Sequence, residues 1–179
     1  MRPGPSVQPV PPALLASRAA VKFLLATVLA VLLLPIAIAV GEASHAGWPH
    51  INGKLVMDKG PAGQQHVLRG VPNRHNELLG GYGNDTIYGG NAGDVLWADY
   101  QGSGQPPQQT TTIYAGNGKN FIYTSHGTST IFTGTGPSVV LAHFGHGTIH
   151  CGSALVQVTV SHTSRGRYQL PGCQHILFN

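Results

Sequence analysis

The amino-acid sequence predicts an all-β solenoid, and three observations support this fold class. A nine-residue phase runs through the middle of the chain, where residues 80–88 read GGYGNDTIY and residues 89–97 read GGNAGDVLW. One aliphatic residue recurs at the eighth position of each unit: Leu78, Ile87, Leu96, Ile113, Ile122, Ile131, Val140 and Ile149. Small residues fill the fourth position: Gly83, Ala92, Gly118, Gly127, Gly136 and Gly145. A fixed period predicts a stack of similar units that bury a core only together.

Each unit has six turn-forming residues followed by three extended residues, which we expect to form a short strand. The phase is interrupted once, because Ala98 to Tyr114 counts seventeen residues instead of nine. Leaving out residues 102–109, which read GSGQPPQQ, restores the nine-residue count. The Pro and Gly content of this segment predicts an eight-residue loop that extends from one turn.

The nonapeptide pattern resembles that of the RTX family, also called haemolysin-type calcium-binding repeats, whose consensus is GGxGxDxUx. Residues 80–97 match this consensus well, the other units match it less closely, and the resemblance covers roughly residues 67–150. It implies a parallel β-roll in which two nonapeptides form one coil. It also implies calcium ions between the turns that stack along each edge.

In such repeats the sixth-position Asp binds calcium together with turn carbonyls. Only two acids remain in this column of the sequence, which reads Asn76, Asp85, Asp94, Thr111, Asn120, Ser129, Ser138 and Gly147. Because successive units alternate edges, Asp85 would face the turn that contains Asp99 and Thr111. By the same rule, Asp94 would face Asn76 and Asn120.

We therefore expect one or two calcium sites in the early turns, with Asp85, Asp94 and Asp99 as carboxylates. Asn76 and Asn120 would complete these sites, together with the glycine-rich turns that contain Gly81, Gly83 and Gly90. The small number of acids predicts weak binding, roughly 0.1 to 1 mM. The alternative is that these aspartates only cap turns through the backbone. Beyond residue 124 we expect Thr and Ser to replace the ion by hydrogen bonds between coils.

Strand positions seven and nine point away from the core, because side chains alternate along a strand. On alternate units both positions are apolar: Val95, Trp97, Phe121, Tyr123, Val139 and Leu141. Such a face predicts a cover within the chain, a continuation of the sheet, or an interface. The candidate cover is residues 155–160, and the interface would serve self-association or an extracellular protein or polysaccharide. Two units per coil would stack Trp97, Tyr123 and Leu141 at about 4.8 Å spacing.

Residues 1–46 are predicted to be an export signal. Arg2, Arg18 and Lys22 precede an eighteen-residue apolar run, residues 23–40, and small residues suitable for cleavage follow it. The alternative is a retained N-terminal membrane anchor, because the run is just long enough to span a bilayer. Residues 47–66 are expected to lead into the repeat region at 67–150, and residues 151–179 to form a C-terminal cap.

The sequence has two cysteines, Cys151 directly after the last repeat and Cys173 further along the predicted cap. In an exported chain they most simply form one disulfide that closes the cap, and two free thiols are the alternative. The surrounding residues 149–153 and 172–176 resemble the C-terminal closure of secreted actinobacterial proteins of this repeat type.

Composition and motifs narrow the function. After removal of residues 1–46 the chain has seven basic and five acidic residues without a Lys/Arg cluster, which argues against nucleic-acid binding. No serine or cysteine nucleophile lies in a recognisable motif, so we expect no enzymatic activity. The leading prediction is an exported calcium-binding β-roll protein with a structural or surface-binding role. The alternatives are a metal-independent self-assembling or adhesive solenoid and, less favoured, a carbohydrate-active β-helix enzyme.

Overall fold

The computed structural model describes residues 51–58, 60–61, 63–100 and 109–179, and within these ranges it is a parallel β-solenoid. The elements are β1 (Leu55–Met57), β2 (Gln65–Arg69), β3 (Asn76–Leu79), β4 (Asn84–Tyr88), β5 (Asp94–Trp97), β6 (Thr110–Tyr114), β7 (Asn120–Tyr123), β8 (Thr128–Phe132), β9 (Ser138–Ala142), β10 (His146–His150), β11 (Val156–Val160), the short 3-10 helix η2 (His162–Ser164), β12 (Tyr168–Gln169) and β13 (His175–Phe178).

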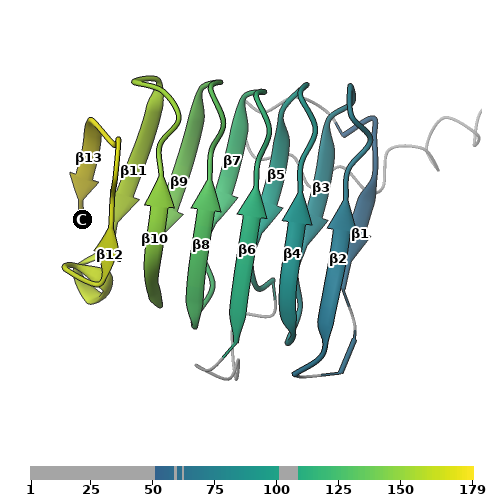
Figure 1. Cartoon of the computed structure of the whole chain (residues 1–179), viewed down its shortest axis with the longest axis horizontal. Helices are drawn as coiled ribbons and strands as arrows, with labels where there is room; N and C mark the ends of the chain where they lie inside the picture. The colour runs from purple at the N-terminus through teal and green to yellow at the C-terminus, as the bar shows by residue number, and fades with distance from the viewer. Residues whose placement is uncertain (1–50, 59, 62, 101–108) are drawn as a thin grey trace, which may run out of the picture. The chain divides into compact units, whose positions relative to one another are not determined.

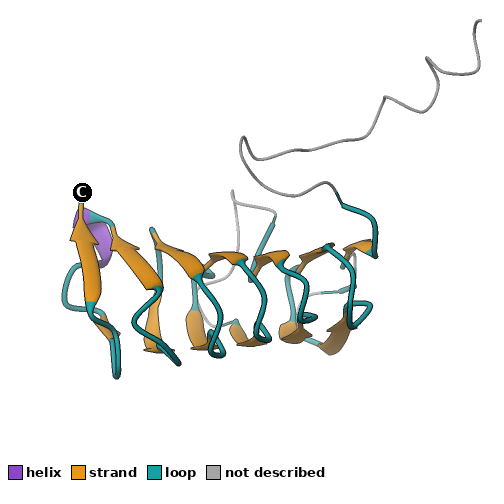
Figure 2. Cartoon of the chain, turned by 90° about the horizontal axis from the view of Figure 1, so that it is seen from above, coloured by secondary structure: helices purple, strands orange, loops and turns teal. Residues whose placement is uncertain are grey.

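The strands alternate between two facing parallel sheets (Figures 1 and 2). The odd-numbered strands form one sheet in the order β1-β3-β5-β7-β9-β11-β13. The even-numbered strands form the other in the order β12-β10-β8-β6-β4-β2. Each coil therefore contains two strands and two nonapeptides, which confirms the predicted β-roll.

The core lies between the sheets and is made of the predicted eighth-position aliphatics. Leu78, Ile87, Leu96, Ile113 and Ile122 are all fully buried, as are the later members of the series. The strand register places each of them beside its equivalent in the next coil, as in the pair Leu96 and Ile122. Burial of one such side chain contributes roughly 1.5 to 3 kcal/mol. The regular column of these side chains is the main reason that this sequence adopts stacked coils.

The strand register also supports the predicted eight-residue insertion. Thr86 pairs with Thr112, 26 residues later, whereas Thr112 pairs with Thr130, 18 residues later. The two pairing intervals differ by eight residues, the predicted length of the insertion. Residues 102–108 of the predicted loop lie outside the described residues. The insertion therefore lengthens one turn without disturbing the register of the strands on either side.

The coils extend beyond the predicted range at both ends. The predicted lead-in segment, residues 47–66, already contains β1 and the first two residues of β2, and β1 pairs with β3. At the other end β11 pairs with both β9 and β13, so residues 151–179 continue the two sheets. Cys151 and Cys173 form a disulfide, which confirms the predicted closure of the cap.

The predicted signal or anchor at residues 1–46 lies outside the described residues. Among the residues that the structure describes, no helix is long and apolar enough to cross a membrane.

Candidate metal centre

The turns between the two sheets lie on two edges of the solenoid. We call edge 1 the side where an odd-numbered strand passes to the next even-numbered strand, at the bottom of Figure 1. Edge 2 is the opposite side, where even-numbered strands pass to odd-numbered ones. Because the sixth position opens each strand, its side chains gather at these edges and point inward, which is why most of that column is buried.

Three metal-ligating side chains meet at edge 1, in the first two coils. Asp58 directly follows β1, His66 lies in β2, and Asp85 lies in β4, in register with His66. His66 Nδ1 is 2.8 Å from Asp58 Oδ2 and 3.5 Å from Asp85 Oδ1. One ligand atom of each residue lies within 4.8 Å of the other two. Asp85 is only 2% exposed, so the cluster reaches from the surface into the buried column.

The ligand atoms of this cluster are in ion-pair contact with one another, but none of them has a hydrogen bond of adequate geometry. The other carboxylate oxygens are satisfied, since Asp58 Oδ1 accepts from the Gly60 amide and Asp85 Oδ2 from the Gly81 amide, both at 2.9 Å. Asp58 Oδ2, His66 Nδ1 and Asp85 Oδ1 are buried without a hydrogen bond of adequate geometry, despite their proximity. Buried polar atoms without partners are costly and call for a missing ligand. A cation among these atoms would satisfy all of them.

Two glycines keep space open beside the cluster. A Cβ at Gly81 would lie 2.8 Å from the Asp58 carbonyl oxygen and 3.1 Å from Asp58 Oδ2. A Cβ at Gly83 would lie 3.0 Å from His66 Nδ1 and 3.1 Å from Asp85 Oδ1, and closer still to the carbonyl oxygen of Gln64. Both positions therefore exclude larger residues, because these turns pack tightly against the cluster.

The electrostatics of the pocket favour a bound cation. Burial raises the pKa of Asp85 above its ordinary range, and the negative charge of Asp58 raises it further. The hydrogen bond from Gly81 and the proximity of His66 oppose this shift only in part. A divalent cation would remove the repulsion between the two carboxylates. Two carboxylates and nearby carbonyls fit calcium, while the imidazole nitrogen is a ligand of a different kind.

Asp94, on edge 2, is in a different state because its carboxylate is fully hydrogen-bonded. Asp94 Oδ1 accepts from the backbone amide of Asn76 at 2.7 Å and from its side-chain amide at 2.6 Å. The other oxygen, Oδ2, accepts from the Gly90 amide. On the opposite side, the backbone amide of Asp94 donates to Asn120 Oδ1 at 3.0 Å. The structure thus brings together Asp94, Asn76 and Asn120 as predicted, through direct hydrogen bonds.

The amide nitrogens of the two asparagines lie where oxygen atoms converge. Asn76 Nδ2 donates to the carbonyl oxygens of Val71 and Arg74 as well as to Asp94. In the coil that follows Asp94, Asn120 Nδ2 donates to the carbonyl oxygens of Gly116 and Gly118 and to Ser138 Oγ. An amide group therefore satisfies the turn oxygens at these positions of edge 2.

Asp99 lies on edge 1, one turn after Asp85, and its Oδ2 is hydrogen-bonded. It accepts from the backbone amide of His126 at 2.6 Å, from Gln109 Nε2 at 2.5 Å, and lies 2.9 Å from His126 Nδ1. Burial raises the pKa of Asp99, and the bonds from His126 and Gln109 offset part of this shift. Asp85 is thus grouped with Asp58 and His66 of the preceding coil, and Asp99 with residues of the coil that follows.

Hydroxyl groups occupy the later turns, as predicted. Ser129 Oγ accepts from the Ser125 amide at 2.9 Å, within one turn. Thr133 Oγ1 lies between coils, where it contacts the His150 carbonyl at 3.4 Å and accepts from the Gly152 amide at 3.1 Å. The Thr133 bonds connect neighbouring coils through neutral groups, as predicted, whereas the Ser129 bond stays within its own turn.

Sequence reasoning missed Asp58 and His66. Counting nine residues backward from Arg69 places His66 at the sixth position and Leu68 at the eighth, as in the later units. A single extra residue, Gly70, separates this unit from the next, so His66 pairs with Asp85 at a distance of 19 residues rather than 18. This shift by one residue hides the fact that His66 belongs to the sixth-position column.

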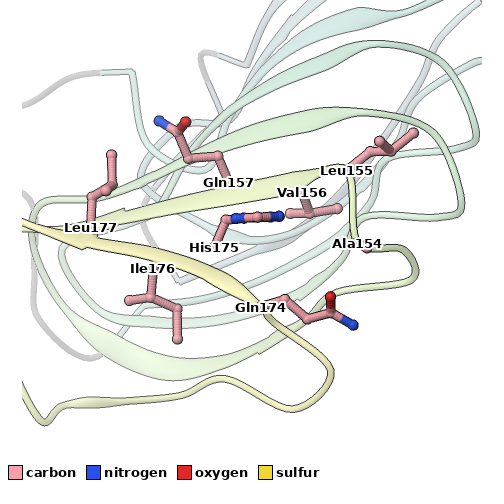
Figure 3. A pocket seen from close by; sticks show the side chains of 8 residues that line it. All are labelled: Ala154, Leu155, Val156, Gln157, Gln174, His175, Ile176 and Leu177. Carbon is pink, nitrogen blue, oxygen red and sulfur yellow. The ribbon is translucent and has the colours of Figure 1, made fainter.

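The predicted apolar face is the outer side of the odd-numbered sheet. Trp97 pairs with Tyr123, and Tyr123 with Leu141, which confirms the predicted stacking. Val95 is buried, whereas Phe121, Val139 and the three stacked residues are half-buried. Residues 156–160 extend the sheet as β11, which is the continuation rather than the cover. A hollow on this sheet at its C-terminal end is lined by residues 154–157 and 174–177, among them Gln157 and His175 (Figure 3).

Part of the repeat region matches a known family. The model of the RTX calcium-binding nonapeptide repeat matches the chain in four copies, over residues 73–99 and 110–140. No curated protein and no solved structure gives a significant match. The match covers the turns of Asp85 and Asp94, and it begins after Asp58 and His66.

Proposed function

Because its repeats are RTX calcium-binding nonapeptide repeats, we propose that this β-roll is an exported calcium-binding protein with a structural or surface-binding role. The observation that supports the metal-dependent role most strongly is the convergence of Asp58 Oδ2, His66 Nδ1 and Asp85 Oδ1 without hydrogen bonds. A metal ion that binds only the folded chain adds its binding free energy to stability. The ion would therefore hold the first coils together rather than take part in a reaction.

Two further observations support export. The Cys151–Cys173 disulfide is typical of proteins in oxidising compartments. Only two carboxylates meet in the pocket, so we expect a calcium dissociation constant of roughly 0.1 to 1 mM, as in extracellular modules. Calcium binding of this strength would matter only where calcium is abundant, outside the cell.

A metal-independent solenoid is the second candidate, and the asparagines of edge 2 favour it. Asn76 and Asn120 satisfy the turn oxygens there with amide groups, so these coils need no ion to complete their hydrogen bonds. In that case the protein would work through its outer faces, by self-association or by docking on an extracellular protein or polysaccharide. The aromatic pair Trp97 and Tyr123, with ring centroids 3.9 Å apart, would belong to such a surface.

Thermal unfolding in calcium and in chelator separates the two candidates. The proposed function predicts that millimolar calcium raises the melting temperature and that magnesium at the same concentration raises it less, because magnesium demands a smaller octahedral site. Equal melting temperatures in calcium and in chelator would reject the calcium-dependent role and leave the metal-independent solenoid.

A further inference from the structure

We propose that the pocket formed by Asp58, His66 and Asp85 binds zinc in preference to calcium. The proposal rests on the proposed role of this pocket as a metal site, and it concerns which ion the pocket selects. It follows from the nature of the third ligand, from the orientation of the His66 ring, and from the distance between the ligand atoms of His66 and Asp85.

The strand register places an imidazole opposite Asp85. His66 and Asp85 are paired residues of β2 and β4, so the sixth-position column contains a nitrogen ligand at this step. Calcium takes six to eight oxygen ligands, whereas zinc is commonly bound by histidine together with carboxylates. Imidazole favours transition-metal ions because it is a softer ligand than carboxylate or carbonyl oxygen. One nitrogen among three side-chain ligands therefore shifts the preference of the pocket toward zinc.

Packing fixes the orientation of the His66 ring. A Cβ at Gly60 would lie 2.5 Å from His66 Nε2 and 3.0 Å from Nδ1, so the ring fits against the backbone of this glycine. In this position Nδ1 faces both carboxylates. The side chain of His66 is 24% exposed, that of Asp58 12% and that of Asp85 0%. The His66 ring therefore lies on the exposed side of the cluster, whereas the three ligand atoms themselves are buried.

One of the two distances from His66 Nδ1 to the carboxylate oxygens suits a tetrahedral ion. Zinc–nitrogen and zinc–oxygen bonds of 2.0–2.2 Å place neighbouring ligands of a tetrahedron about 3.4 Å apart. The distance from His66 Nδ1 to Asp85 Oδ1, 3.5 Å, is close to this value. The distance to Asp58 Oδ2, 2.8 Å, is shorter and is that of a direct ion pair, so a bound zinc ion would have to move these two atoms apart. Three protein ligands would leave a fourth position for water. The competing explanation is a protonated His66 that acts as an internal cation between the two carboxylates.

The test uses the purified full chain with cobalt as a spectroscopic probe for zinc. One equivalent of Co²⁺ should produce the intense visible bands of a tetrahedral N/O site, and zinc should displace it far more readily than calcium, with dissociation constants at least tenfold apart. His66→Asp, which makes all three side-chain ligands oxygens, should abolish these bands and reverse the preference to calcium. His143→Gln changes a histidine that follows β9, several coils away from the pocket, and should behave as the parent protein does.

X-ray absorption on the parent chain loaded with one equivalent of zinc gives a readout that requires no variant. The proposal predicts a single imidazole in the first coordination shell. If calcium stabilises the chain while zinc neither displaces cobalt nor binds more tightly than calcium, the zinc preference is wrong and the proposed calcium role stands. If neither zinc nor calcium binds the parent chain, the zinc preference and the proposed calcium role are both wrong, and His66 serves as the internal cation.

Discussion

The side-chain amide nitrogen of Asn76 lies 2.6 Å from Asp94 Oδ1, and it also donates to two carbonyl oxygens of its own turn. Three oxygens thus surround an NH₂ group at edge 2. At edge 1, Asp85 Oδ1 has no hydrogen bond of adequate geometry; it lies 3.5 Å from His66 Nδ1 and within 4.8 Å of a carboxylate oxygen of Asp58. The same repeat architecture therefore contains one turn that satisfies its oxygens internally and one that leaves them open to a cation.

Asp85→Asn should lower stability in calcium but not in chelator. In chelator the substitution removes the repulsion between Asp85 and Asp58, so the melting temperature should stay equal or rise. In calcium the variant should lose most of the stabilisation that the parent gains, because one of two carboxylate ligands is missing. Melting curves in both conditions provide the measurement.

Ser129→Ala is the matched control, since Ser129 occupies the same repeat position in a turn without acids. It should lose about 1 kcal/mol of unfolding free energy through its hydrogen bonds and keep the full calcium response. A calcium response that survives in Asp85→Asn would place the ion elsewhere.

Asn76→Asp should create a calcium dependence at edge 2. The substitution replaces an amide donor by a carboxylate beside Asp94 and two carbonyls, which leaves the buried oxygens without a donor. We expect a loss of roughly 2 to 4 kcal/mol in chelator, partly recovered in calcium. Urea unfolding in both conditions measures this difference. Asn117→Asp, at an exposed amide of the same edge, should change little; equal losses for both variants would contradict the role assigned to the Asn76 amide.

Most of the fold could be predicted from the sequence because its determinants are local and periodic. The eighth-position aliphatics, such as Ile87 and Ile113, recur at a fixed interval, and each coil repeats the same burial. Even the insertion after residue 101 could be located from the interrupted count. The first coil could not be predicted, because Gly70 shifts the phase of His66 and Leu68 by one residue.

The candidate site was predictable only in part, for a physical reason. The column rule correctly groups Asp94 with Asn76 and Asn120, since all three follow from the register. It does not reveal whether a carboxylate is already hydrogen-bonded, which depends on the directions of nearby amides. Asp58 lies after a short strand outside the nonapeptide pattern, so its contact with His66 and Asp85 becomes visible only in the folded chain.

Loss of the disulfide should destabilise the chain by about 3 kcal/mol, the chain-entropy value for a loop of this size. Cys151 and Cys173 are 22 residues apart, and the bond joins the coil of β10 to the last turn before β13. Urea unfolding of the double variant Cys151→Ser/Cys173→Ser measures the effect. The single variant Cys151→Ser should lose a similar amount, because either change breaks the bond; a double variant as stable as the parent would contradict this account.

Tyr168→Phe should change how stability depends on pH at the alkaline end. Burial raises the pKa of Tyr168, and its hydroxyl donates to the Phe144 carbonyl at 2.7 Å. A raised pKa in the folded state means that the stabilisation is complete below the unfolded value of about 10 and is lost as pH rises through the folded value. The variant should be about 1 kcal/mol less stable than the parent at pH 7.

Above pH 10 this difference should shrink, because only the parent loses stability through ionisation of Tyr168. Urea unfolding of both proteins from pH 7 to pH 11 gives the comparison. A difference that stays constant over this range would show that Tyr168 titrates alike in the folded and unfolded states.

Calorimetric titration of calcium into the parent chain and into Asp85→Asn measures whether calcium binds at Asp85. The account predicts one binding event in the parent, with a dissociation constant of roughly 0.1 to 1 mM, and no measurable event in the variant. Unchanged calcium binding in Asp85→Asn would contradict the assignment of the metal centre to Asp58, His66 and Asp85.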